Sequence, residues 1–152
     1  MGDKSKRVIS QSGFRMLFLA YIGLMIWLLF VQRMNSNISV NGENLNLIPF
    51  KTLCLYWRLL ASDSVFYSKQ AIINLAGNVL MFVPFGIFVP IIWPRFRKFL
   101  AFLVLSSATI VAIETVQYIT SLGSCDIDDL ILNLPGMILG YLLTNQITSV
   151  RR

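Results

Sequence analysis

Four long apolar runs, separated by short polar segments, dominate the pattern of hydrophobic and polar positions along the chain. The runs cover residues 14–31, 71–93, 99–122 and 129–147. A helix needs about 20 mostly apolar residues to cross the hydrocarbon core of a bilayer, and each run is close to that length. The pattern therefore predicts an all-α membrane protein, built as a bundle of four transmembrane helices.

The composition supports this fold class. Hydrophobic residues make up 56% of the 152 residues and charged residues 13%, with a mean hydropathy of +0.69. A soluble domain of this length cannot bury so much apolar surface, so we expect an integral membrane protein in contact with the lipid bilayer. We predict a single membrane domain over residues 1–152, with its motifs confined to residues 46–143.

The basic residues orient the four spans. Nine of the 13 lysines and arginines lie near the two ends of the chain or between the second and third spans. They are Lys4, Lys6, Arg7, Arg15, Arg95, Arg97, Lys98, Arg151 and Arg152. Because such residues collect on the cytoplasmic side, both termini are predicted to be cytoplasmic and the long loop between the first and second spans extracytoplasmic. Topology explains the net charge of +6, so we expect no nucleic-acid partner.

Polar side chains from three spans are predicted to meet near the outer surface. At a rise of 1.5 Å per residue, each lies within about 12 Å of the outer end of its span. Ionisable groups inside a membrane face the bundle interior or a wet cavity, so we expect an outward-facing acidic pocket covered by the long loop. The side chains are Asn74, Asn78, Glu114, Gln117, Asp126, Asp129 and Asn133.

Helical geometry separates the three aspartates at the start of the fourth span. At about 100° per residue, Asp126, Asp129 and Asn133 share one face of a helix, whereas Asp128 points to the opposite side. Asp126 also fits the N-cap position of this helix, and Asp128 fits a role in complementing its positive end. We favour the helix-end role for Asp128 and the pocket for the other two aspartates.

Glycine and proline residues modify the second and fourth spans. Gly136 and Gly140 continue the polar face of the fourth span, and their small-x-x-x-small spacing predicts close packing against a neighbouring helix. Pro84, Pro90 and Pro135 remove backbone donors inside the spans and are expected to bend them.

The residue types present restrict the chemistry. Histidine is absent, which excludes a Ser-His-Asp triad, a Cys-His pair and a His-based zinc site. Metal-assisted chemistry stays open, with Glu114 as general base and Asp126 and Asp129 holding a divalent cation through oxygen ligands. Cys54 and Cys125 fit no metal-ligand spacing. Both are predicted to lie outside, where a disulfide is allowed, and we favour two free thiols.

Four short motifs along the chain carry a resemblance to a known family. They are Asn46-Leu-Ile-Pro-Phe50, Asn78-x-x-x-Phe82-x-Pro84-Phe85-Gly86, Glu114-x-x-Gln117 and Asp126-x-x-Asp129-x-x-x-Asn133-x-x-Gly136. In this order they resemble the VanZ family of small bacterial membrane proteins. The resemblance implies a multi-pass protein of the bacterial cytoplasmic membrane that acts at the cell envelope, and it adds Asn46 to the predicted binding residues.

Three functions follow as hypotheses. The first is that the outward-facing pocket binds a lipid-linked envelope precursor or a lipoglycopeptide and so contributes to resistance against antibiotics of the teicoplanin type, since the family is named for a member linked to teicoplanin resistance. A second hypothesis is a metal-assisted hydrolase or transferase acting on a lipid-linked substrate, with Glu114, Asp126 and Asp129 as catalytic candidates. A third is a structural subunit of a membrane complex. The residue types in the sequence favour binding over catalysis, and all three hypotheses stay open.

Overall fold

The computed structural model describes the backbone of residues 2–31, 45–122 and 125–149. Side chains are described for the same residues except 2–10 and 147–149. The side chains of several residues used in the topology prediction are not among those described, so the cytoplasmic location of the termini stays a prediction. These positions are Lys4, Lys6, Arg7, Arg151, Arg152 and residues 32–44 of the long loop.

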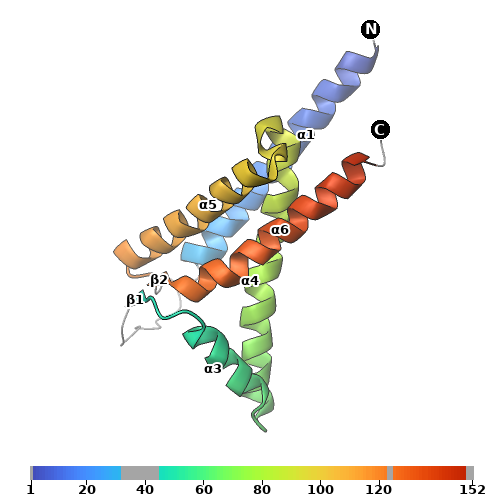
Figure 1. Ribbon diagram of the computed structural model, residues 1–152. Coiled ribbons are helices and arrows are strands. Elements are labelled where there is room, and N and C mark those ends of the chain that lie inside the picture. Colours follow the sequence, from blue (N-terminus) through green and yellow to red (C-terminus); the bar gives the residue numbers. More distant parts are fainter. Residues whose placement is uncertain (1, 32–44, 123–124, 150–152) are drawn as a thin grey trace.

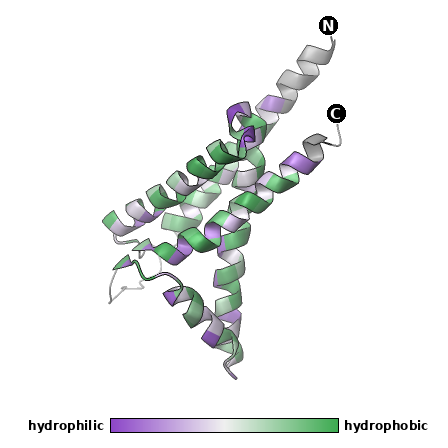
Figure 2. Ribbon diagram, in the orientation of Figure 1, coloured by the Kyte–Doolittle hydropathy of each residue, from purple (hydrophilic) through white to green (hydrophobic). Residues whose placement is uncertain are grey.

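Four long helices form the body of the described structure (Figure 1). They are α1 (Gly2–Ile26, continued by the π-helical turn η1, Trp27–Val31), α4 (Val65–Ile92), α5 (Phe99–Ile119) and α6 (Ile127–Ser149). Each contains a segment long and apolar enough to cross a membrane, which confirms the prediction of four spans. Figure 2 shows hydrophobic residues over most of their length. The main difference is that α4 begins at Val65 rather than near residue 71.

The α4–α6 pair is the closest helix contact in the structure. A Cβ atom added at Gly136 would overlap the carbonyl oxygen of Val79, and one at Gly140 would overlap the carbonyl oxygen of Val83. Gly86 of α4 lies equally close to the backbone of α6. The glycine spacing in the fourth span was therefore a correct indication of close packing, and the partner is α4.

The other two helices pack around this pair to different degrees. Phe102 of α5 is fully buried and stacks on Tyr141 of α6, with ring centroids 4.6 Å apart. The helix α1 is the least buried of the four spans and α6 the most buried. Phe18 is among the aromatic residues that join α1 to the rest, with its ring centroid 6.4 Å from that of Phe85. The helix α1 is thus the peripheral member of the bundle.

The segment that follows the first span contains structure that the hydropathy pattern did not predict. A short strand, β1 (Leu45–Asn46), pairs in parallel with β2 (Cys125–Asp126), so that Asn46 lies opposite Asp126. The helix α3 (Lys51–Leu60) follows β1 and packs against α4. Part of the predicted loop is therefore folded against the start of α6.

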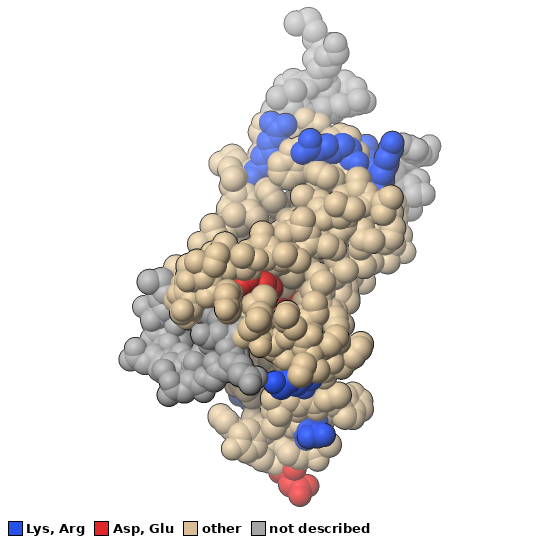
Figure 3. Space-filling view, turned by 60° about the vertical axis from the view of Figure 1, so that its left-hand side comes forward, with Lys and Arg blue, Asp and Glu red and all other residues tan. Residues whose placement is uncertain are grey.

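Charged residues form several groups along the molecule. One group of basic side chains lies near the end that carries the N-terminus, acidic atoms lie in a hollow farther along, and further basic and acidic side chains lie toward the opposite end (Figure 3). The connection between α4 and α5 is a 3-10 turn, η2 (Pro94–Arg97), which contributes Arg95 and Arg97. The ring centroid of Phe18 on α1 lies 5.4 Å from that of Trp93, next to this turn, so the Phe18 part of α1 lies at the level of the turn.

Replacing Gly140 with Ala is expected to lower the melting temperature of the detergent-solubilised protein, because the new methyl group overlaps backbone atoms that no side-chain rotation can move. Overpacking of this kind costs about 1–3 kcal/mol. The control is Gly23→Ala in α1, where an added Cβ meets nothing within 4 Å. Alanine is preferred over glycine within helices, so this variant should keep or raise the melting temperature. Equal melting temperatures for the two variants would contradict the packing argument.

Candidate functional site

Asp128 binds the first turn of α3. Its Oδ1 atom accepts a hydrogen bond from the backbone N–H of Phe50 at 2.6 Å, and its Oδ2 atom accepts from Thr52 and Leu53 at 2.8 and 3.1 Å. Phe50, the N-cap residue of α3, has a left-handed backbone with φ of 66° and offers no capping side chain. The free N–H groups of this helix end therefore obtain their acceptor from α6. The helix-end role predicted for Asp128 concerned α6, whereas these bonds cap α3.

Asp126 serves two elements at once. Its Oδ1 atom accepts the backbone N–H of Asp128 at 2.9 Å, which is the N-cap interaction considered from the sequence. The same atom accepts the side-chain amide of Asn46 at 3.0 Å, and Oδ2 accepts the hydroxyl of Thr52. The carboxylate thus caps α6 and holds the segment between β1 and α3.

The polar face of α5 lies under this junction. Glu114 is 6% exposed, and its Oε2 atom accepts the backbone N–H of Asp126 at 3.2 Å. Gln117 is also buried and donates its side-chain amide to the carbonyl oxygen of Leu29 at 3.2 Å. These two side chains connect α5 to β2 and to the end of the first span.

Asn78 and Asp129 join α4 to α6 on the neighbouring side. The amide of Asn78 donates to Oδ1 of Asp129 at 3.2 Å. One turn farther along α6, Asn133 is 5% exposed, and its Oδ1 atom has no hydrogen-bond partner among the described residues. A buried acceptor left without a donor costs about 1–3 kcal/mol. Asn133 is therefore a polar residue whose acceptor atom the fold does not use.

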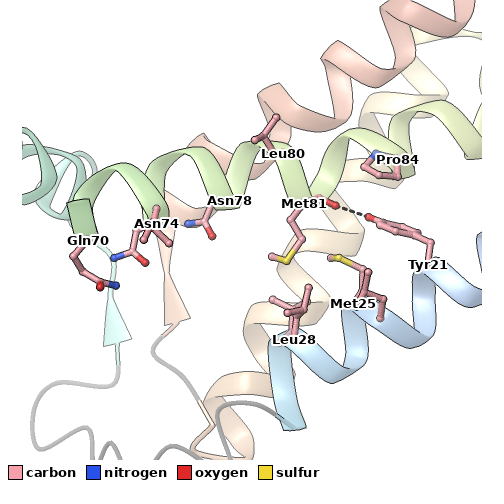
Figure 4. Close-up of a pocket in the computed structure, with 13 residues that line it drawn as sticks. Tyr21, Met25, Leu28, Gln70, Asn74, Asn78, Leu80, Met81 and Pro84 are labelled. Carbon is pink, nitrogen blue, oxygen red and sulfur yellow. Dashed lines mark hydrogen bonds between the residues drawn. The ribbon is translucent and has the colours of Figure 1, made fainter. Parts of the chain in front are cut away.

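A groove of about 670 Å³ opens between the first span and the N-terminal part of α4 (Figure 4). The first-span side is apolar, with Met25 and Leu28 facing the groove, and the hydroxyl of Tyr21 donates to the carbonyl oxygen of Met81 at 3.0 Å. The α4 side carries three amides at four-residue spacing. They are Gln70, Asn74 and Asn78. Asn78 therefore belongs to the groove and, through its bond to Asp129, also contacts the acidic cluster, which consists of Glu114, Asp126, Asp128 and Asp129.

The arrangement of the carboxylates favours structural hydrogen bonding over metal binding. Within the part of the chain that the structure describes, no group of three or more His, Cys, Asp or Glu side chains is arranged to hold a metal ion. Both oxygens of Asp126 and both of Asp128 accept hydrogen bonds from the chain itself. A cation at Asp126 would compete for these oxygens with the amide of Asn46 and the hydroxyl of Thr52.

The structure brings the predicted residues together and adds others. Asn46, Glu114 and Asp126 form one hydrogen-bonded group, Asn78 joins Asp129, and Gln117 lies on the same face of α5 as Glu114. Sequence reasoning missed Thr52, Tyr21 and Gln70. Thr52 belongs to a helix of 10 residues, which is too short to be recognised in a search for membrane spans. The spacing of Gln70 with Asn74 and Asn78 was a readable signal, but the predicted span began one residue after Gln70.

A family model described as VanZ/LLP1 matches residues 18–148. No curated protein matches the chain, and no solved structure does so either.

Removing the Asp128 carboxylate is expected to release α3. In Asp128→Ala three backbone N–H groups lose their acceptor, at a cost of about 1–3 kcal/mol for each donor left buried. Trypsin should then cleave faster after Lys51 or Arg58, because cleavage within a helix requires local unfolding. Asp128→Asn keeps one carbonyl oxygen and should give an intermediate rate.

The matched control is Asp63→Asn, which changes an exposed carboxylate in the turn between α3 and α4. Its cleavage rate should equal that of the unmodified protein. Unchanged cleavage in Asp128→Ala would mean that α3 is held in place by its packing on α4 alone.

Cys125 is expected to react slowly with thiol reagents at neutral pH. Burial raises the pKa of its thiol, and the nearby carboxylates of Glu114, Asp126 and Asp129 raise it further. The reactive thiolate is therefore scarce below that raised pKa. In a Cys54→Ser background, the labelling rate of Cys125 should increase steeply as the pH rises past the usual cysteine range. Glu114→Gln should shift this profile to lower pH.

Asp63→Asn serves as the control here too, because this carboxylate is not among the groups that raise the pKa of Cys125. A profile unmoved by Glu114→Gln would argue against an ionised Glu114 next to the thiol.

Proposed function

Since the chain belongs to the VanZ/LLP1 family, we propose that it binds an amphiphilic molecule at the outer side of the bacterial cytoplasmic membrane. The polar part of the ligand lies at the acidic cluster, and its apolar part lies in the groove between the first span and α4. The ligand is a lipid-linked envelope precursor or a lipoglycopeptide. Through this binding, the protein contributes to resistance against glycopeptides of the teicoplanin type.

The observation that carries the proposal is the position of Asn78. It lines the groove and donates a hydrogen bond to Asp129 of the acidic cluster. An amphiphile needs such a junction, where apolar walls end at polar groups. The remaining amides, Gln70 and Asn74, supply donors and acceptors to an uncharged polar section such as a sugar or a peptide.

The charge of the cluster favours a ligand with a cationic group. Four acidic residues, Glu114, Asp126, Asp128 and Asp129, lie at the start of α6 and the facing end of α5. Asp126 and Asp128 are occupied by the hydrogen bonds described above, so the ligand would be attracted by the summed negative field rather than by direct contact with them. Asp129 is only partly buried and is the carboxylate best suited to direct contact.

Metal-assisted hydrolysis is a weaker candidate, because it requires carboxylate oxygens that this fold uses to hold α3 and β1. A purely structural subunit of a larger complex would have no need of a groove. The experiment below separates that role from ligand binding, because only a binding protein should respond to a change inside the groove.

Gly77→Leu is expected to block ligand binding while leaving the fold intact. Gly77 lines the groove, and an added Cβ there meets nothing within 4 Å, so the larger side chain enters open space. Binding of a fluorescent acylated glycopeptide to the protein in lipid nanodiscs should weaken at least about tenfold, which corresponds to ~1.4 kcal/mol. In susceptible bacteria, expression of the unmodified protein should raise the inhibitory concentration of the acylated glycopeptide, and Gly77→Leu should not.

Gly23→Leu is the matched control, since Gly23 is an exposed glycine of α1 that also has open space around it. This variant should bind and protect like the unmodified protein. The proposal fails if the unmodified protein binds no acylated glycopeptide and no lipid-linked precursor, or if Gly77→Leu binds them as well as Gly23→Leu does.

A further inference from the structure

A second cavity of about 200 Å³ lies between the first span, α4 and α5, and is partly open at Ile26, which is 52% exposed. Its walls include Met25, Phe82 and Ile113, one residue from each of these elements. Among all the residues that line it, only Tyr21 and Thr109 carry a polar side-chain atom. The cavity is separate from the acidic cluster, none of whose carboxylates lines it.

The protons of both hydroxyls are already engaged in hydrogen bonds. Tyr21 donates to the carbonyl oxygen of Met81 at 3.0 Å, and Thr109 donates to the carbonyl oxygen of Leu105 at 2.8 Å. A water molecule needs two to four polar partners to be stable in a buried site, and an apolar cavity of about 150 Å³ stays dry and takes up apolar guests. With two hydroxyl oxygens as the only acceptors in an otherwise apolar lining, the cavity suits a hydrocarbon better than a polar group.

The cavity adjoins the groove described above. Tyr21, Met25 and Leu29 line both spaces, and they follow one another at four-residue intervals along the first span. The partition between the two spaces is thus one row of side chains on the least buried helix of the bundle. Methionine is the most adaptable of the apolar side chains, so Met25 can change rotamer to let a narrow chain pass.

We propose that this cavity receives the end of an alkyl chain that runs through the groove from a polar head at the acidic cluster and the neighbouring amide of Asn78. The inference rests on the proposed function and narrows the ligand class to amphiphiles with at least one unbranched alkyl chain. The chain enters from the groove past Met25 and ends against Phe85 and Thr109. A second chain of a two-chain lipid would stay in the bilayer, since the cavity has room for a segment of only one.

Affinity alone is a poor test of this inference. A chain that moves from the bilayer into the cavity exchanges one apolar environment for another, so the hydrophobic effect contributes little to the transfer. The position of the chain end is the better readout. A suitable probe is an alkyl phosphocholine with a photoreactive diazirine at the last carbon of its chain, added to the protein in lipid nanodiscs.

After irradiation, peptide mass spectrometry should find the label on residues that line the cavity, including Ile113 and Phe82. Ile113→Phe fills part of the cavity and should reduce this labelling at least fivefold, with the affinity for the polar head retained. Val111→Phe adds a similar ring two residues earlier on α5, at an exposed position, and should leave the labelling unchanged. Gly77→Leu should abolish labelling of the cavity, because it closes the route through the groove.

The outcomes distinguish the two proposals. If the probe competes with the acylated glycopeptide but labels only exposed positions such as Val104, the alkyl-chain site is wrong and the groove function stands. Labelling of the cavity that persists in Gly77→Leu also overturns the inference, since the chain then enters by another path. If neither the probe nor the acylated glycopeptide binds more weakly to Gly77→Leu than to the unmodified protein, the proposed function itself fails.

Discussion

Backbone contact between α4 and α6 determines where the polar side chains of the candidate site can meet. Gly136 and Gly140 bring the two helices so close that no Cβ atom fits between them. This approach brings Asn78 within hydrogen-bond distance of Asp129 and leaves the opposite side of α4 to form the groove. In a bilayer the hydrophobic effect does not hold helices together, so close packing of small residues is a main source of their association.

The carboxylates near the start of α6 can be buried because the fold supplies them with hydrogen-bond donors. Burying an ionised carboxylate is costly unless hydrogen bonds replace its hydration. Asp128 receives three backbone N–H groups of the α3 end, and Asp126 receives two side-chain donors and the N–H that it caps. These residues therefore hold β1 and α3 in place, and loss of activity on mutating them would not by itself identify a ligand contact. Asn133 differs, because its buried acceptor has no partner among the described residues.

Much of this architecture could be predicted from the sequence, and the exceptions have a common physical cause. The four spans follow from local hydropathy, and the contact at Gly136 follows from a local spacing. Asp128 was assigned to its own helix because a single sequence shows local neighbours only, whereas its partners lie 75 to 78 residues earlier. The helix α3 was missed for the same reason. Its N-terminal end is completed by a residue of α6, so its own sequence contains no capping signal. The groove depends on how loosely α1 packs, which hydropathy does not report.

The uneven packing of the bundle bears on how a ligand could enter. The helices α4, α5 and α6 are joined by glycine contacts, by a buried aromatic stack and by the hydrogen bonds of the acidic cluster. The helix α1 is attached mainly by aromatic contacts and by the bonds from Tyr21 and Gln117. Separating α1 from α4 therefore breaks fewer interactions than separating α4 from α6. The groove and the second cavity both lie along that seam, and neither is lined by a residue of β1 or α3.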